Sequence, residues 1–226
     1  MSKTIKIFLF LIWSNFYVFA QSPWERLNLI KTINVNAQLI TTDKLGNLYI
    51  VANQEIFKYD ANGTLLQKNS IKSLGNLAML DVSNPMKIMA FFKDYNKIVF
   101  LDNMLAISGS SIDLASIGFD QATLASSSHD NGIWIYNSLN FELVRLEPAL
   151  NNSHQSGNIA QLTGNAIKPT SLFETNNRVY LCDTTIGVLI FDVFGTYIKT
   201  IPIKSIQQQQ VEHNIKYVLY RFNWLR

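Results

Sequence analysis

Cysteine is nearly absent from this sequence, since Cys182 is the only one among 226 residues. A single thiol excludes an intramolecular disulfide, and it also excludes a zinc site built from several cysteines. Cys182 ends the apolar run Val179-Tyr180-Leu181, and no His or Lys lies nearby in the sequence to favour the thiolate. We therefore expect a small buried hydrophobic side chain rather than a reactive thiol.

An excess of charge of one sign is also lacking. The chain has 19 Lys and Arg against 16 Asp and Glu, and two of the bases are Lys3 and Lys6. Without those two, 17 bases face 16 acids. Such a balance lacks the electrostatic signature of nucleic-acid binding, and no basic run suits an anionic membrane. We expect no nucleic-acid partner; a protein or a glycan partner stays open, and the sequence does not predict an oligomeric state.

No hydrophobic run is long enough to span a bilayer. Lys3 and Lys6 precede two short apolar stretches, residues 7–13 and 16–20, and the second ends in Val18-Phe19-Ala20. This is the three-part pattern of a secretory signal peptide. We predict cleavage after Ala20, so that residues 1–20 are the signal and residues 21–226 form one domain without a stable membrane anchor. The product is exported, to the periplasm or the cell exterior.

Two other forms of the N-terminus would keep the chain at a membrane. An uncleaved N-terminal anchor is the alternative, and the short apolar core disfavours it. Gln21 stands where a lipoprotein would need a cysteine, which argues against a lipid anchor.

Helical periodicity is missing after residue 20, and short β-branched and aromatic segments take its place. Seven of them read as strands: residues 48–51, 56–59, 88–92, 97–101, 133–136, 178–182 and 187–191. Turn-forming groups separate them, at residues 44–47, 60–63, 94–96 and 130–132. Short strands at this spacing predict an all-β sandwich, barrel or propeller.

A repeat selects the propeller. Four strands end in an aromatic or apolar residue followed by Asp or Asn: Tyr59-Asp60, Leu101-Asp102, Tyr136-Asn137 and Phe191-Asp192. The steps between them are 42, 35 and 55 residues, which average 44. That period is typical of a four-stranded propeller blade.

Two stretches carry a family resemblance. Residues 43–51 with 56–63, and residues 178–183 with 187–195, each resemble one NHL-type propeller repeat, of the same general kind as WD40 repeats. The resemblance spans most of residues 37–203. It implies an all-β β-propeller of about four to five blades, each a four-stranded antiparallel sheet. It implies no activity, because such propellers serve many unrelated functions.

The ends of the repeat array are irregular. Ile30-Lys31-Thr32-Ile33 recurs as Ile198-Lys199-Thr200-Ile201, so we expect the first copy to supply an outer strand that closes the last blade. Residues 215–220 read as a further strand, Gln207–Gln210 as a loop, and residues 147–164 as a loop between blades. Either the last blade is irregular, or the ring is incomplete at the C-terminus because the sequence is a truncated form of a longer one; we favour truncation.

Candidate chemistry is sparse. Ser126–Asp130 contains Ser, His and Asp, but adjacent residues on a strand point to opposite faces and do not form a relay. His129, His154 and His213 show no metal-ligand spacing. We identify no catalytic residue and expect neither a cofactor nor a metal.

Two further sets of residues have the chemistry that a binding or catalytic site needs. Asp43, Asp81, Asp120 and Asp183 would suit an axial channel, but each also suits a turn or strand end, where Asp accepts backbone N–H bonds. Trp134 reads as filling between blades, whereas Trp24 and Trp224 lie outside the clear repeats and are better candidates for partner contact.

The sequence therefore predicts an exported, non-enzymatic binding or scaffolding propeller. One alternative is a propeller enzyme, a metal-assisted hydrolase or a lyase, with its site on the axis. The other is a truncated gene product without independent function.

Overall fold

The computed structural model describes residues 31–70, 72–203, 208–211 and 217–220. For the two last segments only the backbone is described. All of the sheets belong to the compact unit from Ile33 onwards.

Four antiparallel sheets of four strands follow one another along the chain, and in each the strands are paired in sequence order. The first sheet contains β1 (Leu39–Thr42), β2 (Leu48–Ala52), β3 (Glu55–Tyr59) and β4 (Leu65–Ser70). The second contains β5 (Leu77–Asp81), β6 (Ile88–Phe92), β7 (Lys97–Leu101) and β8 (Ile112–Asp113). The third contains β9 (Ala122–Ser127), β10 (Ile133–Asn137), β11 (Glu142–Leu146) and β12 (Asn152–Gln155). The fourth contains β13 (Pro169–Thr175), β14 (Arg178–Asp183), β15 (Gly187–Asp192) and β16 (Tyr197–Ile201).

The remaining elements are short. Three single-turn 3₁₀ helices are η1 (Lys72–Leu74), η2 (Lys93–Tyr95) and η3 (Ala115–Ile117), and α1 spans Ile159–Thr163. A separate hairpin pairs β17 (Gln208–Val211) with β18 (Tyr217–Tyr220). The all-β prediction is therefore confirmed, and all seven strands expected from the sequence are present.

The second and third sheets pack on both of their faces, because the apolar residues of their inner strands do not alternate with polar ones. In β6, Ile88, Ala90 and Phe92 pack into the core shared with the first sheet, whereas Met89 and Phe91 pack into the core shared with the third. Successive strand residues point to opposite faces, so a continuous apolar run supplies two interfaces at once. Burying each of the larger side chains contributes about 1.5–3 kcal/mol relative to leaving it exposed.

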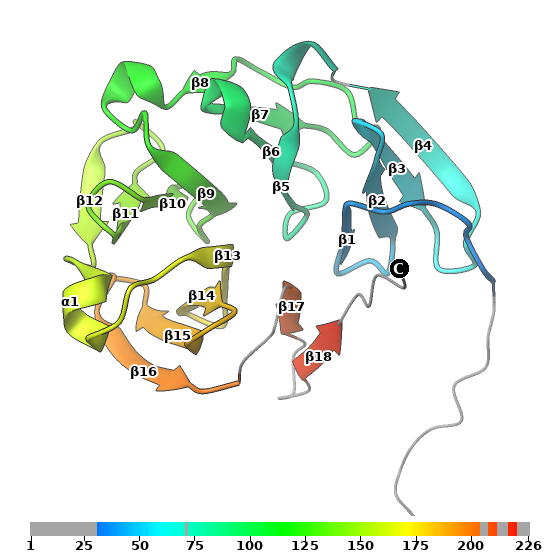
Figure 1. Ribbon diagram of the computed structural model, residues 1–226. Coiled ribbons are helices and arrows are strands. Elements are labelled where there is room, and N and C mark those ends of the chain that lie inside the picture. The colour runs from blue at the N-terminus through cyan, green and yellow to red at the C-terminus, as the bar shows by residue number, and fades with distance from the viewer. Residues whose placement is uncertain (1–30, 71, 204–207, 212–216, 221–226) are drawn as a thin grey trace, which may run out of the picture. The chain divides into compact units, whose positions relative to one another are not determined.

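The first strand of every sheet lies on the inside. β1 neighbours β5, β5 neighbours β9 and β9 neighbours β13, although none of these pairs is joined in a sheet. The fourth strands, β4, β8, β12 and β16, lie at the periphery (Figure 1). Sheets that stack face to face with their first strands innermost are blades of a β-propeller.

The structure corrects the repeat predicted from the sequence. The expected third anchor, Tyr136-Asn137, ends the second strand of its sheet, not the third. The equivalent turn begins at Glu147, whose N–H bonds the carbonyl of Asn151, as Asp60 bonds Thr64 in the first blade. The four turns then begin at residues 60, 102, 147 and 192, at steps of 42, 45 and 45 residues.

Sequence differences at these turns explain the error. Three of them begin with Asp, whose Oδ1 accepts two later N–H groups, whereas the third begins with Glu147-Pro148. Gly63 in the first blade and Gly195 in the fourth take positive φ. The equivalent residues of the second and third blades are Leu105 and Leu150, with φ of 63° and 66°. A leucine in this left-handed conformation breaks the turn signature that glycine provides.

Three other expectations fail. The presumed inter-blade loop at residues 147–164 contains the fourth strand β12 and all of α1, and Gln208–Gln210 belongs to β17 rather than to a loop. Residues 31–33 lie in no strand, so they do not form the expected closing strand, and Ile30 lies outside the described residues. Its sequence copy, residues 198–201, does form an outer strand, within β16.

Candidate functional site

A pocket of about 360 Å³ lies where four hairpin turns meet, one from each blade. These turns join the first strand to the second: β1 to β2, β5 to β6, β9 to β10 and β13 to β14. The lining residues, called the mouth pocket from here on, are Lys44, Ser83, Asn84, Lys87, Phe100, Ser127, Ser128, His129, Asn131, Gly132, Glu174, Thr175, Asn176 and Asn177. All but Phe100 and Gly132 are polar. Each blade contributes its lining residues from its own part of the sequence.

Local chemistry fixes the shape of these turns. Asp43 accepts hydrogen bonds from the N–H groups of Leu45 and Asn47, at 2.9 Å each, so the carboxylate organises the first turn. Asn176 and Asn177 both have positive φ, 50° and 55°, and together form the two-residue turn of the β13–β14 hairpin. Two such residues match the right-handed twist of the strands, and asparagine tolerates the conformation better than most side chains.

Glu174 is the centre of the hydrogen-bond network at the pocket. Its Oε1 lies 2.7 Å from Nδ1 of His129 and accepts the His129 N–H at 3.1 Å. Its Oε2 accepts bonds from Oγ of Ser128 and Nε1 of Trp134, both at 2.7 Å. The Glu174 side chain is only 4% exposed, and all four partners belong to the preceding blade. The carboxylate therefore ties the fourth blade to the third.

Asp81 has the same role one junction earlier. It ends the inner strand β5, and its Oδ1 and Oδ2 accept the N–H groups of Ser83 and Ser127 at 2.9 and 2.7 Å. Ser127 ends the inner strand of the next blade. A carboxylate with both oxygens bonded to protein donors holds the rim of the pocket and presents little negative charge to a ligand.

Arg145 supports the pocket wall from behind. This residue is buried on β11, and its guanidinium bonds Oγ of Ser128 at 3.2 Å, Oγ of Ser153 at 2.9 Å and the carboxylate of Asp130. Burial alone would raise the pKa of Asp130, but the hydrogen bonds from Arg145 and from the Gly132 N–H, together with the Arg145 charge, outweigh it and hold that pKa below its ordinary value. Ser128 thus accepts from Arg145 while it donates to Glu174.

Ser128, His129 and Asp130 do not form a relay, because their side chains have different partners. Ser128 and His129 both contact Glu174, whereas Asp130 contacts Arg145. The contact with Glu174 fixes Nδ1 of His129 and leaves the imidazole side chain 53% exposed. An imidazole oriented by a carboxylate in this way can bind a ligand or accept a proton through its other nitrogen.

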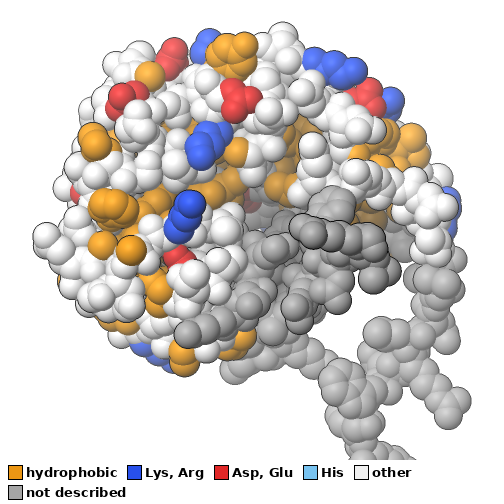
Figure 2. All heavy atoms as spheres, in the orientation of Figure 1, with side chains coloured by type: hydrophobic (Ala, Val, Ile, Leu, Met, Phe, Trp, Pro, Cys, Tyr) orange, Lys and Arg blue, Asp and Glu red, His pale blue; other side chains and the backbone are white. Residues whose placement is uncertain are grey.

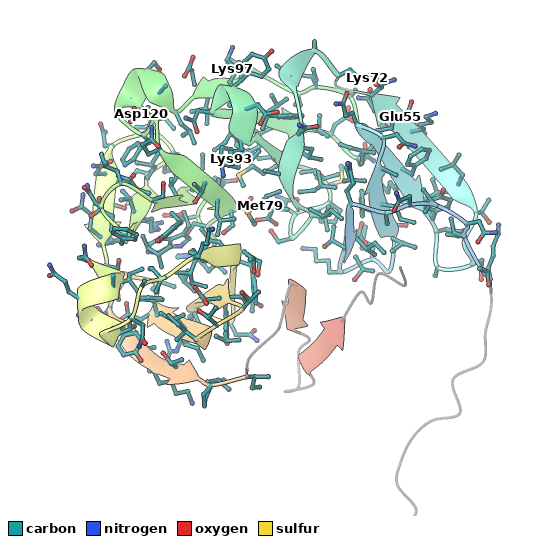
Figure 3. The ribbon with its side chains drawn as sticks, viewed as in Figure 1. Glu55, Lys72, Met79, Lys93, Lys97 and Asp120 are labelled. Carbon is teal, nitrogen blue, oxygen red and sulfur yellow. The ribbon has the colours of Figure 1, made fainter. Side chains whose placement is uncertain are left out.

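The four acids considered for an axial site do not converge. Asp43 and Asp81 lie at the pocket end of their blades, whereas Asp120 precedes β9 and Asp183 ends β14, at the opposite end. A strand of six residues such as β9 spans roughly 20 Å, so Asp120 is remote from the pocket. Figure 3 shows Asp120 at the outer edge of the ribbon, well away from Met79 of the inner strand β5.

Asp183 has a structural role instead. Its carboxylate accepts bonds from the N–H groups of Lys168, Thr185 and Ile186 and from the Thr185 hydroxyl, at 2.6–3.1 Å. Burial raises the pKa of Asp183, but these bonds outweigh it and lower the pKa overall.

The other candidates are dispersed or fall outside the described residues. His154 lies on β12, edge-on to the ring of Phe194 at 5.2 Å, and His213, Trp24 and Trp224 are not described. Trp134 is fully buried between the third and fourth blades, as expected. Cys182 is fully buried as well, and burial raises its pKa to about 11.

The described residues contain neither a metal-binding cluster nor a membrane-spanning helix. Within the described part of the chain, no three His, Cys, Asp or Glu side chains are grouped to hold a metal ion. No helix there has the length and apolar character needed to cross a membrane. On the face drawn in Figure 2, Lys and Arg side chains are scattered, and those at the upper right lie beside an acidic side chain.

Sequence reasoning missed the residues that matter most at the mouth pocket. Glu174, Arg145 and Lys87 lie in separate blades and form no motif with each other or with His129. A single acid in the otherwise neutral strand β13 was the only local signal for Glu174.

Comparisons with known proteins agree with this architecture. No protein-family model and no curated protein matches the sequence. Among solved structures, the WD40 β-propeller domain of Doa1 is similar with a TM-score of 0.59 and 12% identity, over 85% of this chain and 63% of that one. The WD40 domain of Neurospora crassa Pan2 is similar with a TM-score of 0.51 and 12% identity, over 81% of this chain and 60% of that one. A streptogramin B lyase is similar with a TM-score of 0.51 and 12% identity, over 74% of this chain and 55% of that one.

These likenesses establish a WD40-like β-propeller fold and nothing finer, because the identities are low. The chain spans between about half and two thirds of the length of these three structures.

Proposed function

We propose that this chain is an exported, non-enzymatic binding module whose ligand or partner is held at the mouth pocket. Export rests on the signal-peptide pattern of residues 1–20. Binding rests on one observation: turns from four separate blades bring polar side chains together around one cavity of about 360 Å³. The fold alone does not decide the function, since its structural neighbours include both WD40 domains and a lyase.

The geometry favours binding for a physical reason. Rigid scaffolds place functional residues on loops, and concave sites of roughly 300–1,000 Å³ are typical of ligand pockets. Here the loops are anchored to one another by Asp81 and Glu174, so the pocket is formed before a ligand arrives. Preorganisation of this kind improves affinity because less side-chain freedom is lost on binding.

A blocking substitution tests this proposal. Ser83 is exposed and lines the pocket, so Ser83→Trp should fill it, whereas Ser73→Trp places the same side chain on η1 outside the pocket. A library of neutral, anionic and cationic small molecules and short peptides is screened by ligand-observed NMR. We expect binders of the wild-type protein that Ser83→Trp rejects and Ser73→Trp retains. Binders that tolerate Ser83→Trp, or no binder at all, would refute the proposal.

A second candidate is an enzyme with its site at the same pocket. The observation in its favour is the pairing of His129 Nδ1 with Glu174 at 2.7 Å, because a carboxylate-oriented imidazole is a common general base. Prolonged incubation of each binder with the protein, followed by NMR, distinguishes the two. Conversion that His129→Gln abolishes while binding persists would establish an enzyme; unchanged binders would leave the binding module.

A further inference from the structure

The mouth pocket has a distinctive charge balance. Its charged lining residues are Lys44, Lys87 and Glu174, and His129 adds an ionisable ring. Both oxygens of Glu174 accept bonds from the neighbouring blade, and its side chain is 4% exposed. In the described part of the chain, neither lysine forms a salt bridge. The charge that a ligand meets is therefore positive.

Lys87 is held in place rather than free in solvent. Its Nζ lies 4.5 Å from the ring centroid of Phe100, and the residue is half-buried. A cation over an aromatic face is attracted by the ring and loses part of its hydration. An ammonium group that is already oriented and partly dehydrated pairs with an anion at a smaller cost.

Neutral hydrogen-bond donors at the pocket also favour an anionic ligand. Oδ1 of Asn84 accepts the N–H of Met86 at 3.1 Å, which leaves the amide nitrogen as its free polar atom. Asn131, Asn176 and Asn177 also line the pocket, each on a backbone fixed at positive φ. Amide N–H groups beside two ammonium groups make a site that donates hydrogen bonds more than it accepts them, as a carboxylate or phosphate requires.

We propose that the mouth pocket binds a small anionic ligand through a carboxylate or phosphate group held by Lys44 and Lys87. This inference rests on the proposed binding function and specifies the chemistry of its ligand. The cavity volume of about 360 Å³ suits a compound of monosaccharide size rather than a folded partner. Glu174 takes no direct part; it holds His129 and Ser128 at the pocket wall.

Four probes separate charge from shape. D-glucuronate and D-glucose 6-phosphate carry a carboxylate and a phosphate on the same ring, D-glucose is neutral, and inorganic phosphate is the anion alone. Titration calorimetry on the purified protein should detect the charged sugars and not glucose. Binding should weaken as NaCl rises from 0.1 to 1 M, because salt screens exposed charges. Which anion binds more tightly identifies the preferred group, and either result supports the inference.

Matched variants locate the contact. We expect Lys44→Gln and Lys87→Gln each to reduce affinity for the charged sugars roughly 10-fold to 100-fold, as charged hydrogen bonds predict. Lys93→Gln makes the same charge change on η2, at the end of β6 remote from the pocket, and should have no effect. Lys44 is exposed, so its variant should keep the wild-type fold.

Three results would overturn this inference: equal binding of charged and neutral sugars, no binding of the anions, or an equal loss of affinity in all three lysine variants. Its failure is distinct from failure of the binding module, because neutral binders that Ser83→Trp rejects would sustain the module without the anion.

Discussion

Replacing Glu174 by glutamine should unfold the junction between the third and fourth blades more readily. An amide of the same shape has one oxygen and one NH₂, whereas the present site offers donors to both oxygens: the His129 N–H on one side and the Trp134 indole N–H on the other. Whichever way the amide lies, its NH₂ faces an N–H donor: the fully buried indole N–H of Trp134 or the more exposed backbone N–H of His129. One N–H is left without an acceptor, and the remaining hydrogen bonds no longer involve a charged carboxylate.

The magnitude follows from those losses. A buried donor without a partner costs about 1–3 kcal/mol, and bonds to a charged group are each worth about 1.5–3 kcal/mol, part of which the amide retains. We expect Glu174→Gln to lower the free energy of unfolding by about 3 kcal/mol, which for a chain of this size lowers Tm by roughly 6–12 °C.

The assay is urea unfolding followed by tryptophan fluorescence, with calorimetry for Tm. Glu147→Gln is the matched control, because Glu147 is exposed and its turn is made by the backbone; it should change stability by less than about 0.5 kcal/mol. In a double-mutant cycle, Trp134→Phe removes one of the facing donors, so Glu174→Gln should cost less in that background. Equal stability of Glu174→Gln and Glu147→Gln, or strict additivity in the cycle, would refute the tie between blades.

Three further outcomes are expected elsewhere in the chain. The folded-state pKa of Asp183 lies below its unfolded value, so the stabilisation that its carboxylate provides is present above about pH 4 and is lost as pH falls through the folded pKa. Asp183→Asn should therefore lower Tm at pH 7 and flatten the acid side of a Tm–pH profile. An unchanged profile would contradict the structural role of the Asp183 carboxylate. Cys182, with its pKa raised to about 11, should resist Ellman's reagent at pH 8 until the protein is denatured, and rapid labelling of the native protein would show an accessible thiol. Gly187→Ala places a Cβ 2.2 Å from the carbonyl oxygen of Ile201 at φ +120° and should cost about 3 kcal/mol or more, against about 1 kcal/mol for Gly109→Ala, which meets open space; equal Tm changes would be inconsistent with this.

Much of the blade architecture could be read from the sequence, because the interior strands are apolar at consecutive positions. That pattern at Ile88–Phe92 requires two packed faces, and the structure supplies both. The exact repeat could not be read, since Glu147-Pro148 removed the aspartate that marks the other turns. Propensity likewise misled at Gln208–Gln210, where strand pairing overrides a polar composition.

The candidate site was much less predictable than the fold. The mouth pocket is assembled from turns about 40 residues apart, and each turn alone resembles an ordinary surface loop. Glu174 and His129 are 45 positions apart, and only the stacking of blades brings them within 2.7 Å. Contacts of this separation leave no local pattern, and the acids that did show a pattern, such as Asp183, proved to hold turns.

The leucines at the turns of the two middle blades bear on how such a chain can diversify. Leu105 is fully buried in the core between the first and second blades, and Leu150 packs into the next core. At the same place in the fourth blade, a Cβ on Gly195 would lie 3.2 Å from the backbone of Gln155. Each blade is therefore fitted to the one before it. A second or third blade moved into the fourth position would bring its leucine against the Gln155 backbone, so such an exchange requires the turn to change to glycine in the same step.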